Sequence, residues 1–333
     1  MKRKLSPILV GDWSLIGPSP DLYGVLPGAD EWRRGWIENG RAAEHNAPVD
    51  HHIVQDINGG WHLWGCVRAT AVGRILHHWR TNDFLASPWE QTGEIIRVNR
   101  AAGESAGNTT AIDINSAREE CIQSPFFVRH GSLYHMFYGG GAAPGGSEQD
   151  GLGRRSQICL MTSPDGLAWT RHKGPGGRSS LFEGPGPARD PCVVPFEGGW
   201  LLYYAGTRED ASGSPVFWVR TSTDLLTWSA PRVVHEDLGI SAQRWGTECP
   251  FVTFRDGWFY LFRTVNYYAA RTYVFRSGDP FDFGIGDARG KCAGMISAAA
   301  PELYTLPGGA GYVSSNHEPR TGTMRCRLEW VEQ

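Results

Sequence analysis

Apolar and polar positions follow one repeated pattern along this chain. A small or acidic residue and a proline precede a short apolar strand, a tight turn and a second strand rich in aromatic residues. The pattern is clearest in three segments, which read SPFFVRHGSLYHMFYGG from Ser124, RDPCVVPFEGGWLLYYAGT from Arg189 and ECPFVTFRDGWFYLFRT from Glu248. This regularity predicts one supersecondary unit, a β-hairpin, that is used repeatedly.

Two more copies of the hairpin share this register. VDHHIVQDINGGWHLWGC begins at Val49, and APELYTLPGGAGYVSS begins at Ala300. The starts of the five copies are Asp50, Pro125, Pro191, Pro250 and Pro301, which lie 75, 66, 59 and 51 residues apart. Glycine-containing turns join the two strands of the copies, as is typical of hairpins. We therefore expect five units of similar architecture.

A second phrase follows the hairpins and marks the end of a third strand. It reads TSPDGLAW from Thr162 and TSTDLLTW from Thr221, with a looser version, RSGDPFDF, from Arg276. Ser and Asp close turns through bonds to the backbone, and Trp packs between sheets. Units of this length, little amphipathic helical periodicity and 43 glycines predict an all-β fold, a five-bladed β-propeller. A β-sandwich or a β-helix is the alternative.

The domain organisation that follows is simple. Residues 46–333 are expected to form the propeller. Residues 1–45 form an N-terminal segment, with Trp13, Trp32 and Trp36, that packs on the propeller or lines its mouth. The Gly-rich stretch 139–153 is a long loop inside one blade rather than a domain boundary.

Composition narrows the partners and the compartment. The net charge is −3 without a basic block, so nucleic acid is not expected as a partner. No apolar run reaches the length of a membrane span, and the opening MKRKLSPILVGDW does not read as a signal peptide. Seven cysteines without CxxC pairs fit buried free thiols in a reducing compartment. We expect a cytoplasmic protein, unless a leader has been removed.

Three carboxylates fall at nearly the same point of the repeat. They are Asp50, Asp190 and Glu248 in the first, third and fourth copies. The innermost strands of propeller blades run along the central channel, so these acids are expected to face one pocket. Mutual repulsion and partial burial raise the pKa of one carboxyl so that it donates a proton, while another stays ionised as base or nucleophile. Glycoside hydrolysis needs this division of roles.

The chain here resembles the five-bladed glycosidases of glycoside hydrolase families 32, 43 and 68, from about residue 45 to the C-terminus. Arg189-Asp190-Pro191 looks like the family 32 motif whose Asp stabilises the transition state and whose Arg grips sugar hydroxyls. Glu248-Cys249-Pro250 looks like that family's acid motif, in which the Glu is the general acid. The resemblance implies an O-glycosyl hydrolase.

The first blade departs from the family 32 pattern. Asp50 stands 11 residues before the Trp61-His62-Leu63-Trp64 strand, as the family's nucleophile does, but the letters around it differ, with Val49 before it and His51-His52 after it. Family 43 uses its first-blade Asp as a general base with inversion, so retention and inversion both stay open. The rival for the role is Asp56, which we interpret as a solvated turn residue before Asn58-Gly59-Gly60.

Other polar and aromatic residues are candidates for binding substrate. His51 and His52 flank the presumed base and are expected to orient it rather than to ligate a metal, although family 43 members sometimes hold calcium at the propeller axis. We expect no cofactor and no catalytic metal, and a structural calcium in the central channel is the one ion that the resemblance allows. The remaining substrate-binding candidates are Arg189, Trp64, Trp245, Arg244, Gln123, Ser124 and Glu302, with weaker ones at His317 and Arg320. His77, His78 and His135 are interpreted as packing residues.

The sequence thus predicts an exo-acting glycosidase that cleaves a terminal furanosidic or pentose linkage of an oligosaccharide or glycoside. The linkage would be of the β-fructofuranoside or the α-arabinofuranoside/β-xyloside type. Asp50 is the nucleophile or base, Asp190 the transition-state stabiliser or pKa modulator, and Glu248 the acid. A family 130-like phosphorylase and a non-catalytic carbohydrate-binding propeller are the alternatives.

Overall fold

The computed structural model describes residues 3–22, 25–26, 46–104, 120–142, 156–242 and 246–333. Within these ranges the chain is almost all β-strand, with short 3-10 turns and no α-helix. The elements are β1 Leu5–Pro18, β2 Ala47–Gln55, β3 Trp61–Thr70, β4 Gly73–Thr81, β5 Glu90–Ile96, η2 Arg100–Ala102, β6 Glu120–Cys121, β7 Gln123–His130, β8 Leu133–Ala142, β9 Ser156–Ser163, β10 Thr170–Arg171, η3 Pro175–Gly177, β11 Ser180–Glu183, β12 Arg189–Phe196, β13 Gly199–Thr207, β14 Pro215–Ser222, β15 Arg232–His235, β16 Glu248–Arg255, β17 Trp258–Asn266, β18 Arg271–Ser277, η5 Arg289–Lys291, β19 Cys292–Ile296, β20 Glu302–Thr305, β21 Gly311–Glu318 and β22 Gly322–Glu332.

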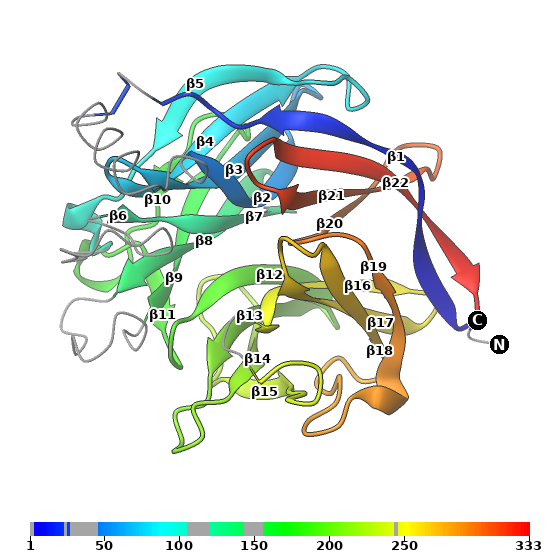
Figure 1. Cartoon of the computed structure of the whole chain (residues 1–333). Coiled ribbons are helices and arrows are strands. Elements are labelled where there is room, and N and C mark those ends of the chain that lie inside the picture. The colour runs from blue at the N-terminus through cyan, green and yellow to red at the C-terminus, as the bar shows by residue number, and fades with distance from the viewer. Residues whose placement is uncertain (1–2, 23–24, 27–45, 105–119, 143–155, 243–245) are drawn as a thin grey trace, which may run out of the picture. The chain divides into compact units, whose positions relative to one another are not determined.

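The strands form five sheets, which are the blades of the predicted propeller (Figure 1). The sheet orders are β2-β3-β4-β5, β7-β8-β9-β10, β12-β13-β14-β15, β16-β17-β18-β19 and β20-β21-β22-β1, with β6 added beside β4 and β11 beside β9. The first two strands of each sheet are one copy of the sequence repeat, because a tight turn joins neighbouring strands into a hairpin. The prediction of an all-β fold with five blades is confirmed.

The residues divide into two compact units. Unit 1 comprises Met1–Ser14, Gly184–His317 and Met324–Gln333, and unit 2 comprises Leu15–Glu183 and Glu318–Thr323. The sheets that begin with β2 and β7 belong to unit 2, and those that begin with β12 and β16 belong to unit 1.

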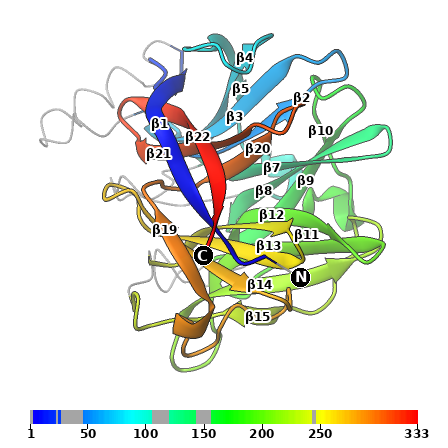
Figure 2. The same cartoon turned by 90° about the vertical axis from the view of Figure 1, so that its right-hand side faces the viewer.

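The N-terminal strand corrects the predicted domain boundary. Residues 1–45 were expected to lie outside the blades, but β1 is an outer strand of the last sheet, beside β22 (Figures 1 and 2). The pairing occurs because β22 would otherwise leave a row of unpaired backbone groups at a sheet edge. Trp13 packs against His317, with ring centroids 4.6 Å apart. Trp32 and Trp36 lie outside the described residues.

Aromatic residues of the second strands fill the blade interiors, as their pattern predicts. Tyr138 on β8, Tyr203 and Tyr204 on β13, and Tyr260 and Phe262 on β17 are all fully buried. Burial of such side chains contributes about 1.5–3 kcal/mol each relative to exposure. These central strands hold the hairpin openings in fixed positions.

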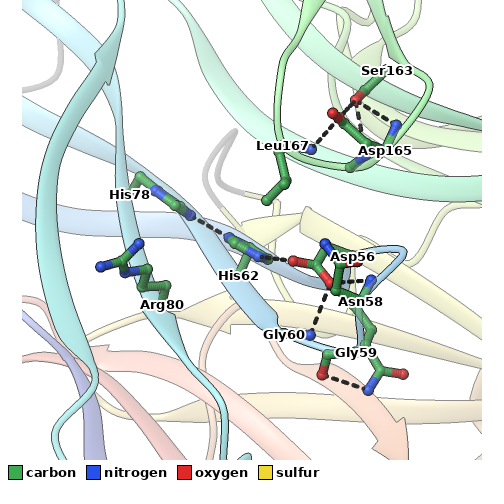
Figure 3. A network of polar contacts seen from close by, with 12 residues as sticks. Asp56, Asn58, Gly59, Gly60, His62, His78, Arg80, Ser163, Asp165 and Leu167 are labelled. Atoms are coloured by element: carbon green, nitrogen blue, oxygen red, sulfur yellow. Dashed lines mark hydrogen bonds and ion pairs between the residues drawn. The ribbon is translucent and has the colours of Figure 1, made fainter.

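The repeated Ser-x-Asp phrase closes turns as predicted. Ser222 Oγ accepts the N–H of Leu225, and Asp224 Oδ1 accepts the N–H groups of Leu226 and Thr227. These backbone donors lower the pKa of Asp224 to about 2. The turn at Ser163 and Asp165 has the same bonds (Figure 3).

In the part of the chain that the structure describes, no helix is long and apolar enough to cross a bilayer.

Candidate active site

A β-bulge interrupts the first strand of four blades. On β16, Glu248 pairs with Thr264 and Phe251 pairs with Phe262, so two residues oppose one on β17. The same two-against-one shift lies between Pro48 and His51, Gln123 and Phe126, and Arg189 and Cys192. Bulges of this kind bend a strand, re-aim a side chain and are common beside active sites.

In three of these bulges the residue before proline has a left-handed backbone, and so has the equivalent residue of the last blade. The φ angles are 52° at Ser124, 57° at Asp190 and 50° at Cys249, and Ala300 before Pro301 has 47°. A side chain in this region costs roughly 1–2 kcal/mol, and such outliers gather at functional sites. The same strained conformation at this position in four blades therefore suggests that the strand openings form a functional site.

Each predicted acid occupies a different position of its bulge. Glu248 is the last paired residue before the bulge, Asp190 is the first bulged residue, and Asp50 is the second. The repeat alignment correctly assigned all three to the strand openings. It did not reveal the bulge, which allows neighbouring positions of different blades to carry the acids.

Asp190 and Glu248 of unit 1 are held together by Arg189. Arg189 donates from Nη2 to Glu248 Oε1 and from Nε to Glu248 Oε2 at 3.4 Å, and its Nε lies 3.7 Å from Asp190 Oδ2. Its Nη1 donates to the carbonyl of Pro187 at 3.1 Å. Asp190 Oδ2 also accepts the N–H of Cys249 at 3.0 Å, which joins the bulges of two successive blades.

The cluster sets one guanidinium against two carboxyl groups away from water. Arg189, Asp190 and Glu248 are only 6%, 6% and 8% exposed. Burial works against the charge of Arg189, but the carboxylates of Glu248 and Asp190 outweigh it and raise the pKa of Arg189 above its usual range. The guanidinium therefore stays charged, hydrogen-bonds to Glu248 and lies beside Asp190.

Tyr267 joins the cluster although the sequence analysis did not select it. It lies in the turn between β17 and β18, and its hydroxyl is 2.7 Å from the Cys249 sulfur. No local motif marks this tyrosine, because its contact depends on the fold of the hairpin. A half-buried phenol beside the acid motif is a suitable group for meeting a sugar hydroxyl.

Asp50 lies in unit 2, where it is 8% exposed and accepts a hydrogen bond from Ser124 Oγ at 3.0 Å. Gln123 is held through its Oε1 by the guanidinium of Arg74. Asp50 and the two second-blade candidates thus meet at the strand openings of unit 2. The convergence of Asp50 with Asp190 and Glu248 of unit 1 stays a prediction of the repeat register.

His52 links the strand of Asp50 to the next blade of unit 2. Its Nδ1 accepts the N–H of Phe127 at 3.2 Å, and its ring lies 4.2 Å from that of Phe126. Burial, with His51 beside it, lowers the pKa of His52 to about 3, so the ring is neutral with its proton on Nε2. The lowered pKa keeps the Nδ1 lone pair available as the acceptor for Phe127. His51 is 2% exposed, and the calcium expectation stays a prediction.

The remaining candidates fare differently. Trp64 is 1% exposed and stacks on His78 at 4.5 Å, so it presents no face to a sugar, and that prediction is wrong. The sequence could not show which face of β3 is buried. Glu302 is half-buried at the start of β20 and stays a candidate, whereas Arg320 is exposed. Arg244 and Trp245 lie outside the described residues.

Asp56 is a structural residue, but it is buried rather than solvated. Its Oδ1 accepts the N–H groups of Asn58 and Gly60 at 2.7 and 2.9 Å, and its Oδ2 lies 3.0 Å from His62 Nε2. His62 Nδ1 is 2.9 Å from His78 Nε2, so the groups form a hydrogen-bonded chain across two strands (Figure 3). All three are at most 9% exposed, and His77 and His135 are also buried, in line with the packing interpretation.

No protein-family model and no curated protein matches the sequence. Solved structures do match. A thermostable family-43 glycoside hydrolase has a TM-score of 0.59 at 14% identity, covering 86% of this chain and 90% of that chain. An α-L-arabinofuranosidase from Lactobacillus brevis has a TM-score of 0.57 at 13% identity, with 84% and 90% covered. A family 32 β-fructofuranosidase from Bombyx mori has a TM-score of 0.58 at 14% identity, with 92% and 67% covered. The chain therefore shares its fold with five-bladed propeller glycosidases of families 43 and 32.

Proposed function

We propose that the protein is a glycoside hydrolase that cleaves a terminal furanosidic or pentose linkage. The observation that carries the proposal is the buried cluster in which Arg189 clamps Glu248 and lies beside Asp190, at the openings of two successive blades. The fold shared with solved structures of families 43 and 32 supports the proposal. Fold alone does not establish a reaction, so the proposal depends on these site residues.

In this proposal Glu248 is the general acid that protonates the leaving oxygen. Glu248 accepts the hydrogen bonds of Arg189 in the structure, so proton donation requires this contact to open. A sugar hydroxyl that draws Arg189 away would release Glu248 to take up a proton. Substrate binding and protonation of Glu248 are then coupled, so Glu248 stays ionised while no substrate is bound.

Asp190 and Asp50 supply the remaining negative charge. Asp190, fixed by the N–H of Cys249 and by Arg189, is placed to stabilise the positive charge that develops on the sugar ring. Asp50, with one oxygen bound by Ser124, is the nucleophile or base. A carboxyl separation near 5 Å between Asp50 and Glu248 would favour retention, and roughly 6.5–9.5 Å would favour inversion.

The substrate class is proposed from the fold neighbours. Their names include an α-L-arabinofuranosidase and a β-fructofuranosidase, both of which act on furanosides. We therefore expect the enzyme to prefer a terminal arabinofuranosyl or fructofuranosyl unit to a terminal xylosyl unit. A sugar held by the clamped acids and by the hydroxyl of Tyr267 fits such a small ring.

The test is hydrolysis of aryl α-arabinofuranoside, β-fructofuranoside, β-xyloside and β-galactofuranoside by wild type and Glu248→Gln. We expect turnover of one glycoside and a loss of at least about 10² in Glu248→Gln, as for removal of a general acid. Glu209→Gln, an exposed site, is the matched control. Sugar binding without turnover of any of the four would instead indicate a binding propeller.

A further inference from the structure

A fully buried arginine holds the segment that leads into Glu248. Arg263 on β17 is 0% exposed, and its guanidinium donates from Nε to the carbonyl of Gly246 at 2.8 Å and from Nη2 to that of Ser241 at 3.3 Å. Its Nη1 donates to the carbonyl of Asp237 at 3.1 Å. One side chain thus binds the carbonyls of Asp237, Ser241 and Gly246.

The fourth partner of this guanidinium is a histidine whose protonation state is fixed by its neighbours. Nη1 of Arg263 lies 3.1 Å from Nε2 of His235, and Nδ1 of His235 lies 3.1 Å from the carbonyl of Phe283. Because a carbonyl only accepts, Nδ1 carries the proton and Nε2 accepts from Arg263. Burial and the charge of Arg263 lower the pKa of His235 to about 3, which keeps this acceptor neutral.

The same segment is fixed from within by a carboxylate. Asp237 accepts the N–H groups of Gly239 and Ile240 through Oδ1 at 2.9 and 3.2 Å, and that of Ala288 through Oδ2 at 3.2 Å. The buried guanidinium has carbonyls and an imidazole as its bonding partners, and burial lowers the pKa of Arg263 to about 10. The free-energy cost of burying this charge is offset by its hydrogen bonds to several acceptors.

The position of Arg263 relative to Glu248 gives the arrangement its meaning. Gly246, bound by Arg263, is separated from Glu248 only by the buried Thr247. On the neighbouring strand, Glu248 pairs with Thr264, the residue after Arg263. Arg263 therefore fixes Glu248 from two directions, through the segment before it and through the strand beside it.

We propose that Arg263, with neutral His235, is a positioning residue that sets the reach of the Glu248 carboxyl. This inference rests on the proposed glycosidase function, since it assigns Arg263 a role in proton donation. In this proposal Arg263 acts through the backbone of Gly246, Thr247 and Glu248 and through the pairing of Glu248 with Thr264. Loss of the bond to the Gly246 carbonyl should displace Glu248.

Leaving-group dependence separates positioning from general stability. Hydrolysis of a 2,4-dinitrophenyl glycoside needs little protonation of the leaving oxygen, whereas a phenyl glycoside of the same sugar needs a well-placed acid. We expect Arg263→Met to lose at least about tenfold more activity on the phenyl than on the dinitrophenyl substrate, because acid catalysis contributes about 10²–10⁴-fold. Arg263→Lys, which keeps the charge and some donors, should lose less. Arg271→Met, on the exposed start of β18, is the control.

A second measurement does not depend on turnover. Amide hydrogen exchange at Gly239 and Ile240 should speed up in Arg263→Lys and in His235→Gln, because the segment loses its central bonds. Equal activity losses on the two glycosides, or unchanged exchange in both variants, would overturn the inference. If wild type cleaves neither glycoside, the proposed function fails, and exchange alone then decides whether Arg263 holds the segment. If Arg263→Met does not fold, Arg263→Lys and His235→Gln carry both measurements.

Discussion

Replacing Asp56 by alanine removes the acceptor at the centre of the chain in Figure 3. Two backbone N–H groups and the ring of His62 lose their partner at distances of 2.7, 2.9 and 3.0 Å. A hydrogen bond to a charged group contributes about 1.5–3 kcal/mol. In the variant, water can replace the carboxylate as acceptor for the N–H groups of this turn, which offsets part of the loss. We therefore expect a net destabilisation of about 3 kcal/mol, close to a loss of one and a half such bonds.

The effect depends on pH in a defined direction. Burial works to raise the pKa of Asp56, but hydrogen bonds from His62 and from the N–H groups of Gly60 and Asn58 outweigh it and lower the pKa below its usual value. A carboxyl with a lowered folded-state pKa stabilises the fold above its unfolded pKa of about 4, and this contribution is lost as the pH falls through the folded pKa. The gap between wild type and Asp56→Asn should therefore close below about pH 4.

Urea unfolding at pH 7 and at pH 3 measures both effects. Asp56→Asn retains an oxygen acceptor for the two N–H groups and should cost less than Asp56→Ala. Asp12→Ala, at an exposed position of β1, is the control and should change the free energy of unfolding by less than about 0.5 kcal/mol. An Asp56→Ala variant as stable as wild type, or a gap between wild type and Asp56→Asn that is equal at pH 7 and pH 3, would refute the reasoning.

Three further predictions follow from single residues. Arg189→Lys cannot reproduce the fork that binds Glu248 and the Pro187 carbonyl, so kcat/KM on the cleaved glycoside should fall by about 10–100-fold, and an unchanged value would mean that the clamp has no role. His52 should show no ring titration by NMR between pH 8 and pH 5, because its pKa is lowered to about 3, and a midpoint near 6.5 would contradict its burial. Ala270→Gly should raise the free energy of unfolding by about 1 kcal/mol, since Ala270 has a φ of 47°, and a loss in urea unfolding would show that the turn is not strained.

Most of the fold could be predicted from residues that lie close together in the sequence. The proline, the turn glycines and the aromatic strand lie within about twenty residues of one another, so the repeat predicted the five hairpins. The partner of the N-terminal strand was not predictable in this way, because β1 pairs with β22 at the far end of the chain. The alternation of apolar and polar residues in β1 predicts a strand but does not identify the strand with which it pairs.

The site was predicted in part for the same reason. Arg189, Asp190 and Glu248 stand in short motifs, and the structure joins them in one cluster. The contact of Tyr267 with Cys249 and the burial of Trp64 depend on strand register and on which face of a sheet is covered. The left-handed residue before proline also has no fixed identity in the sequence, since Ser, Asp, Cys and Ala occupy this position in different blades.

The pairing of β1 with β22 has a consequence for the order of folding. Cys326 on β22 bonds to the carbonyls of Val10 and Gly11, across sequence separations of 316 and 315 residues. Contacts this distant form slowly, because the loop between them must close first. During synthesis β1 is made long before β22, so β1 lacks its pairing strand until β22 has been synthesised. We expect this interval to be the time when the nascent chain is most prone to aggregate and most dependent on chaperones.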